Sequence, residues 1–157
     1  MIGVVAPTSQ SLEVFFDIET DPLRDLCYLH GFVVRENGDA ATERFIAFFA
    51  EPETAEAERD AFAAAWAFIQ QHAEGVIVYY SKYERTVYRT LAEKYPDVCS
   101  RDHVEALFAV PRSFDLYFDA VKRSEWPTMD YSVKTLAKFC GFKWRDTDPS
   151  GAASIQW

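Results

Sequence analysis

Hydrophobic residues in the first third of the chain form three runs that are typical of β-strands. The runs cover residues 12–19, 27–34 and 42–49, and they are rich in aromatic and β-branched residues. A turn sequence, Asp21-Pro22, follows the first run, and Asn37-Gly38, a strong hairpin signal, lies between the second and the third. Because the connections are short, we expect the three strands to form an antiparallel meander.

The spacing of hydrophobic residues becomes helical after this meander. Phe62, Trp66 and Ile69 lie four and three residues apart, which predicts an amphipathic helix over 54–72. A compact apolar run at 76–80 then predicts a fourth strand. Because a helix links these strands, we expect a crossover that places the fourth strand beside and parallel to the first.

Shorter elements are predicted for the rest of the chain. Ser81 and Glu84 have the spacing of a capping box, S-x-x-E, which predicts that Ser81 caps a helix ending before Pro96. Helices are also expected at 101–108 and 131–139. The segment 114–117 fits either the end of a short strand or the first turn of a helix.

These elements together predict one α+β domain over residues 1–157, with a mixed sheet of three antiparallel strands, a parallel crossover strand and flanking helices. Asp148-Pro149 has the pattern of a helix start. The helix that would follow is cut short at Trp157, so we expect a fragment truncated at its C-terminus.

Composition narrows the class of protein. With 157 residues, 49% hydrophobic and 26% charged, the chain resembles an ordinary soluble domain rather than a disordered one. No apolar run approaches the roughly 20 residues that cross a bilayer, and the first residues lack the basic region of a signal peptide. The three cysteines are widely spaced, as reduced thiols of a cytoplasmic protein are.

The net charge limits how the chain can bind nucleic acid. Sixteen Lys and Arg against twenty-five Asp and Glu give a net charge of −9. Proteins that bind nucleic acid through phosphates alone usually carry the opposite sign. A phosphate-bearing substrate therefore requires bound cations, or a basic partner domain. Neither the cysteines nor the three histidines have the spacing of a zinc site.

Carboxylates at the end of the first strand are the main chemical candidates. Asp17 and Glu19 are two residues apart, so on a strand they point to the same face. Two anions so close repel each other unless a cation shares them, and oxygen-only ligands suit Mg²⁺ or Mn²⁺. The alternative is a solvated strand end whose acids face water.

Further candidates follow from the predicted crossover. It places Glu84 near Asp17, where a third carboxylate would complete a metal cluster, although a capping-box glutamate is also explained by the helix start alone. Asp115 is a weaker candidate metal ligand, because an acid at a helix start ordinarily caps it. Lys134 is a candidate phosphate contact and Tyr83 a candidate base contact, although exposed lysines and rim tyrosines usually have neither role.

An ordered set of motifs resembles a known family. Phe16-Asp17-Ile18-Glu19-Thr20 resembles the first motif, D-x-E, of DEDD-type 3′–5′ exonucleases of the ribonuclease-H-like superfamily. A closer similarity is to the ribonuclease-H-like domain of predicted RecB-family nucleases, the YprB-like group. The segments that carry it, in order, are 16–22, 79–84, 115–117, 131–136 and 149–154.

This resemblance implies a ribonuclease-H-like three-layer fold and a metal-dependent, 3′–5′ exonuclease-like nuclease working by a two-metal mechanism. Asp17 and Glu19 are implied as metal ligands, with Glu84 standing where many DEDD enzymes have aspartate. The family's last acid would follow the final helix, beyond Trp157, so the fragment alone is expected to bind metal weakly. Implied partners are nucleic acid, DNA or RNA, and other domains of a larger RecB-like protein.

Two other functions remain open from the sequence. One is a non-catalytic scaffold that keeps the fold and recruits partners, within a larger nuclease or helicase protein. The other is a haloacid-dehalogenase-like phosphatase, in which a hydrophobic strand also ends in two acids two residues apart. Against the phosphatase, its second acid should be Asp rather than Glu19, and two more strands should not follow directly.

Overall fold

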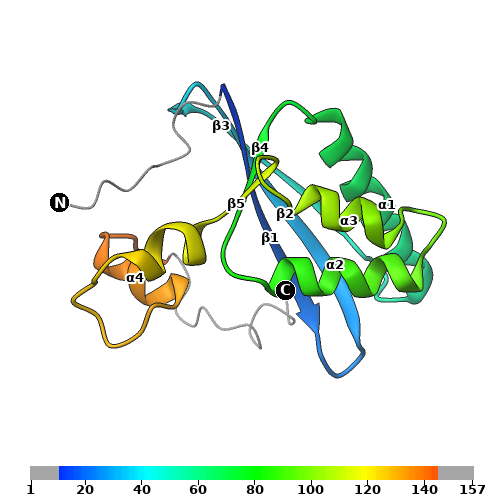
Figure 1. Cartoon of the computed structure of the whole chain (residues 1–157). Coiled ribbons are helices and arrows are strands. Elements are labelled where there is room, and N and C mark those ends of the chain that lie inside the picture. Colours follow the sequence, from blue (N-terminus) through cyan, green and yellow to red (C-terminus); the bar gives the residue numbers. More distant parts are fainter. Residues whose placement is uncertain (1–10, 145–157) are drawn as a thin grey trace.

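A five-stranded mixed sheet organises the chain in the computed structural model, which describes residues 11–144 (Figure 1). The strands follow the spatial order β3-β2-β1-β4-β5. Strand β2 is antiparallel to both β1 and β3, whereas β4 is parallel to β1 and β5 is parallel to β4. The predicted α+β fold with an antiparallel meander and a parallel crossover strand is therefore confirmed.

The meander consists of β1 (Leu12–Asp21), β2 (Leu26–Glu36) and β3 (Asp39–Phe49). The hairpin between β2 and β3 turns at Asn37 and Gly38, whose φ angles of 52° and 69° are both positive. Two consecutive positive φ angles are the requirement of the type I′ hairpin turn that Asn-Gly favours. The strand pairings and this turn are those that the sequence predicted.

The crossover helix α1 (Ala55–Gln71) packs on the sheet and leads to β4 (Val76–Tyr79). Thr54 caps α1, and its hydroxyl accepts a hydrogen bond from the Ala57 N–H at 3.2 Å. Side chains at alternate positions of β1 enter the main core, where Phe16 stacks on Phe32 with ring centroids 5.0 Å apart. The opposite positions of β1, which include the predicted acids, are therefore left on the other face.

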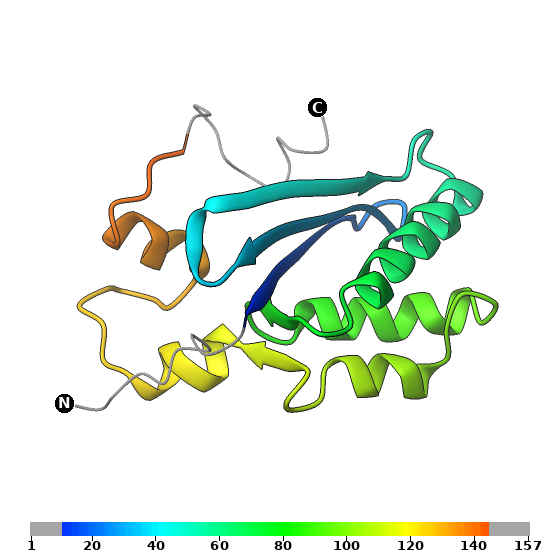
Figure 2. The same cartoon turned by 90° about the horizontal axis from the view of Figure 1, so that it is seen from above.

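Two helices and a short strand follow: α2 (Tyr83–Lys94), α3 (Arg101–Leu107) and β5 (Ser113–Asp115). The chain then forms a short π-helical segment, η1 (Leu116–Ala120), and a 3₁₀ turn, η2 (Val121–Arg123). The uncertain segment 114–117 thus contains both a strand end and a helix start. Helices α1, α2 and α3 lie together on one side of the sheet (Figures 1 and 2).

The capping box predicted at Ser81 is wrong. Ser81 has a φ angle of 71°, a left-handed conformation that an N-cap residue does not adopt. Lys82 takes the N-cap position instead, and it makes no side-chain capping hydrogen bond within the described chain. Glu84 is therefore not a capping-box residue, and its burial has another cause.

The last described helix is α4 (Val133–Phe139), which lies on the other side of the sheet from α1–α3 in Figure 1. Ser132 caps it, and Gly141, with a φ angle of 91°, follows its end. Among the described helices, none is long and apolar enough to span a membrane. The motif at 149–154 and the helix expected after Asp148 lie outside the described residues.

Candidate active site

The two acids of β1 lie on the face of the sheet opposite the main core. Their neighbours Phe16 and Ile18 are buried at 4% and 3% exposure, whereas Asp17 is exposed and Glu19 is half-buried. Alternation along the strand therefore places Asp17 and Glu19 together on one face, as the sequence predicted. Both acids line a shallow groove of about 220 Å³.

The crossover brings the start of α2 to this face of β1. Strand β4 pairs in parallel with β1 through Phe15 and Val78, and α2 begins four residues after β4 ends. Glu84, in the first turn of α2, is only 4% exposed and lies close enough to Asp17 for each to shift the pKa of the other. The predicted proximity of Asp17 and Glu84 is confirmed.

Burial and mutual repulsion determine how these carboxyl groups ionise. Removal from water, followed by the charges of Asp17 and Asp115, raises the pKa of Glu84 to about 8. Although Asp17 is exposed as a residue, removal of its carboxyl group from water raises its pKa, while the Ile18 backbone and the neighbouring Glu84 act to lower it. The raised pKa of Glu84 favours its neutral form at neutral pH.

Glu19 extends this cluster toward α4. Partial burial, and then the charge of Asp17, raise the pKa of Glu19, whereas the nearby ammonium of Lys134 acts to lower it. The first turn of α4 therefore contributes a cation next to the acids. Lys134, predicted as a phosphate contact, lies within electrostatic range of Glu19.

Asp115 lies at the end of β5 and is 9% exposed. Its Oδ1 accepts hydrogen bonds from the backbone N–H groups of Ser81 at 2.9 Å, Tyr117 at 3.0 Å and Phe118 at 3.2 Å. It caps η1, as an acid at a helix start ordinarily does. Its charge also acts on Glu84, so it borders the acid cluster while serving this structural role.

Two aromatic contacts connect the loops around the acids. The hydroxyl of Tyr83, half-exposed at the start of α2, hydrogen-bonds the hydroxyl of Thr20 on β1 at 2.5 Å. The hydroxyl of Tyr80 donates to the backbone carbonyl of Tyr131, just before α4. Tyr83, a candidate base contact from the sequence, thus lies beside the end of β1.

The donor set has the chemistry of a hard-cation site. Within residues 11–144, no three Asp, Glu, His or Cys side chains converge closely enough to hold a metal ion as they stand. Glu84 Oε2, however, is buried and has no hydrogen-bond partner among the described residues. A buried carboxylate oxygen without a donor, beside two further carboxylates, fits a site for Mg²⁺ or Mn²⁺.

The groove beside the acids was not predicted from the sequence. Gly31, opposite Asp17 on β2, forms part of its floor: a Cβ there would lie 3.6 Å from the Phe45 ring and 3.7 Å from the Asp17 carbonyl. Phe45 is 69% exposed on this face. A signal for this groove was present in the sequence, because several positions on the same face as the acids are apolar. These positions are Phe15, Gly31, Val33 and Phe45.

The histidines take structural roles. His30 is fully buried, its Nδ1 hydrogen-bonds the hydroxyl of Tyr88 at 2.9 Å, and burial lowers its pKa to about 3. His103 completes a capping box with Ser100 at the start of α3. The three cysteines are free thiols, and the described structure gives no reason to assign them to the site.

Comparisons with known proteins agree with this architecture. A model of the RNase H superfamily matches residues 14–157. A product-bound structure of exonuclease I is similar in fold, with a TM-score of 0.56 and 18% sequence identity. The similarity covers 94% of this chain and 42% of that one, so the chain spans less than half of the exonuclease I chain. No curated protein sequence matches the chain.

Proposed function

The chain belongs to the RNase H superfamily, and from this premise we propose that it is a nuclease domain that hydrolyses phosphodiester bonds with divalent cations, Mg²⁺ or Mn²⁺. The observation that carries the proposal is the buried Glu84 carboxyl, whose Oε2 has no hydrogen-bond partner among the described residues and which lies within electrostatic range of Asp17 and Asp115. Two carboxyl groups meet only when a proton or a cation lies between them. The fold brings them together at the face where Glu19 also lies.

Each residue has a role in this proposal. Asp17, Glu19 and Glu84 would hold the cations, and Glu19 or Glu84 would orient the attacking water. Divalent cations bound there supply positive charge for the phosphate oxygens and make water more acidic. Lys134 would contact a phosphate of the substrate, and Tyr83 would contact a base of the substrate. Asp115 is the weakest candidate ligand, because its Oδ1 already accepts three backbone hydrogen bonds.

The finer assignment rests on the ordered motifs together with the fold. We propose a DEDD-type, 3′–5′ exonuclease-like activity of the YprB-like RecB-family group, in a cytoplasmic protein with further domains. The likeness to exonuclease I supports the fold of such an enzyme. The net charge of −9 indicates that other domains would supply much of the affinity for nucleic acid.

The test is a metal titration followed by a nuclease assay. We expect Mn²⁺ to bind saturably to the chain in a calorimetric titration, and Asp17→Ala to abolish this binding. In the full-length protein with Mn²⁺, we expect degradation of a 3′-labelled single strand, reduced at least about 100-fold in Asp17→Asn, since even an outer-shell partner costs 10–100-fold. Asp97→Asn, a surface acid paired with Arg59, is the control and should keep full activity.

A second function, a non-catalytic scaffold, is favoured by one observation. Within the described chain no group of three ligands is already converged. A scaffold predicts that neither the wild type nor Asp17→Ala responds to Mn²⁺, although both are folded, and that a chain extended past Trp157 also fails to respond. A response that appears only on extension would support the nuclease. The haloacid-dehalogenase-like alternative does not fit the meander that follows Glu19.

A further inference from the structure

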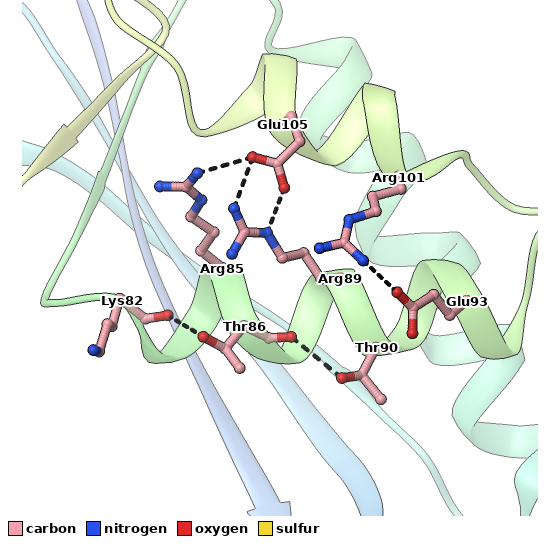
Figure 3. A network of polar contacts seen from close by, with 8 residues as sticks. All are labelled: Lys82, Arg85, Thr86, Arg89, Thr90, Glu93, Arg101 and Glu105. Carbon is pink, nitrogen blue, oxygen red and sulfur yellow. Dashed lines mark hydrogen bonds and ion pairs between the residues drawn. The ribbon is translucent and has the colours of Figure 1, made fainter.

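An arginine pair near the acids has no part in the proposed chemistry. Arg85 and Arg89 project from α2 toward Glu105 of α3 (Figure 3). Arg89 binds this carboxylate with two groups, Nε to Oε1 and Nη2 to Oε2 at 2.8 Å. Arg85 Nη2 reaches the same Oε2 at 2.9 Å. Three N–H groups from two guanidinium groups thus converge on one anion.

The arrangement around Glu105 has the geometry of an oxyanion site. A guanidinium group presents parallel N–H donors that match a carboxylate and a phosphate equally well. The two arginines also hold the pKa of Glu105 at about 2, so it remains an anion over the ordinary pH range.

A second observation shows that Glu105 does not satisfy this site. Arg85 Nε is buried and has no hydrogen-bond partner within residues 11–144. A buried donor without an acceptor is unfavourable. A phosphodiester carries two charged oxygens, as a carboxylate does, and two ester oxygens besides, so it offers acceptors for this additional donor.

The position of the pair relates it to the acids. Arg85 directly follows Glu84, and Arg89 lies about 6 Å farther along the helix at 1.5 Å per residue. Arg101, at the start of α3, pairs with Glu93 at 2.6 Å and lies beside the arginine pair (Figure 3).

We propose that Arg85 and Arg89 bind the phosphate backbone of a single-stranded nucleic acid next to the acid cluster, and that Glu105 occupies this site until the strand displaces it. The inference rests on the proposed function and specifies the path of its substrate. The alternative is that the three side chains only join α2 to α3.

The test measures affinity with cleavage suppressed by EDTA. Fluorescence anisotropy would follow a labelled oligothymidylate, and in parallel an oligouridylate, of about 12 nucleotides at about 50 mM salt. We expect Glu105→Gln to tighten binding about three- to tenfold, because it frees the arginines. Arg85→Gln and Arg89→Gln should weaken binding and each lower the slope of log K against log salt by about 0.7.

A matched control separates this effect from net charge. Asp97→Asn changes the charge equally and releases Arg59 Nε and Nη2 from Asp97, while Arg59 Nη1 keeps its 3.0 Å contact with Asp60. Equal tightening in Glu105→Gln and Asp97→Asn would overturn the inference. The inference would also be overturned if both arginine variants kept the wild-type affinity but had lower melting temperatures. That result is expected if the arginines only bridge α2 and α3.

The design also separates this inference from the proposed function. If the wild type cleaves nucleic acid with Mn²⁺ while the arginine variants bind normally, only the inference fails. If binding follows the expected pattern although neither this chain nor a chain extended past Trp157 cleaves nucleic acid, the nuclease proposal fails. The proposed binding path is then kept. If neither oligonucleotide binds the wild type, the inference is overturned.

Discussion

A buried glutamate lies at each end of α2. One glutamate is surrounded by hydrogen-bond donors and a cation, and the other by further acids. At the C-terminal end the glutamate is Glu58 of α1, which is 1% exposed. Its Oε1 accepts from the Cys27 N–H at 2.7 Å, and its Oε2 accepts from Lys94 Nζ at 3.1 Å and from the Tyr95 hydroxyl at 2.5 Å. This carboxylate is fully supplied with donors and connects three elements.

At the N-terminal end Glu84 is buried almost as deeply but faces other acids. Asp17 and Asp115 are its charged neighbours, and its Oε2 lacks a partner within the described chain. Burial alone does not distinguish the two carboxyl groups, because both glutamates are buried. What differs is whether the surroundings supply donors or further anions.

Among substitutions that test the difference between the two glutamates, we expect the largest effect on stability at Glu58. Glu58→Ala leaves the Cys27 N–H, Lys94 and Tyr95 without their acceptor, so we expect the free energy of unfolding to fall by about 3 kcal/mol. Urea denaturation measures this. Glu84→Gln is the comparison and should not destabilise the chain at neutral pH. Equal losses in both variants would contradict the distinction between the two ends.

A smaller effect concerns the pH dependence that Glu84 produces. Its pKa is about 8 in the folded chain against 4.5 for the ordinary group, so between these values the folded state keeps a proton that the unfolded state has lost. Stability from this proton is complete below about pH 4.5 and is lost as the pH rises through 8. The expected slope is up to about −1.4 kcal/mol per pH unit.

His30 determines where this slope can be observed. Its pKa of about 3, against an ordinary 6.5, makes stability rise with pH between those values. The two effects oppose each other below about pH 6.5, so the wild type should lose stability mainly between pH 6.5 and 8. Subtracting a Glu84→Gln titration removes the His30 contribution. A difference between the two proteins that does not change with pH would argue against the raised pKa of Glu84.

The smallest expected effect is at Ser81, which leads into α2. Its φ angle of 71° is unfavourable for a residue with a Cβ. Ser81→Gly keeps the N–H that binds Asp115 and should raise stability by up to about 1 kcal/mol. Thermal unfolding measures it, with Ser100→Gly, at an ordinary cap, as a control expected not to stabilise. Loss of stability in Ser81→Gly would show that its side chain has a role of its own.

Much of this architecture could be predicted because strong local patterns coincide with the fold. The meander, α1 and the parallel β4 each have a clear hydrophobic period, and the crossover then places Glu84 beside Asp17. The capping box failed because Ser81 adopts a left-handed conformation. Residue types alone do not show that conformation for serine.

The ion pairs around α2 could not be predicted, because they join residues that are distant in the sequence. Glu58 looks like one of many surface acids on α1, and only the folded chain brings Lys94 to it, 36 residues later. Likewise Arg89 and Glu105 are 16 residues apart and on different helices. Their meeting depends on how α2 and α3 pack, which no local pattern encodes.

Asp115 has a consequence for how such a domain can change through evolution. One oxygen of this side chain receives the N–H of Ser81, after β4, and those of Tyr117 and Phe118, after β5. The connections after β4 and after β5 are therefore both hydrogen-bonded to the same oxygen atom. An insertion or deletion in either connection would disturb both, so we expect their lengths to vary together among related chains, while the hairpin at Asn37 and Gly38 is free to lengthen alone.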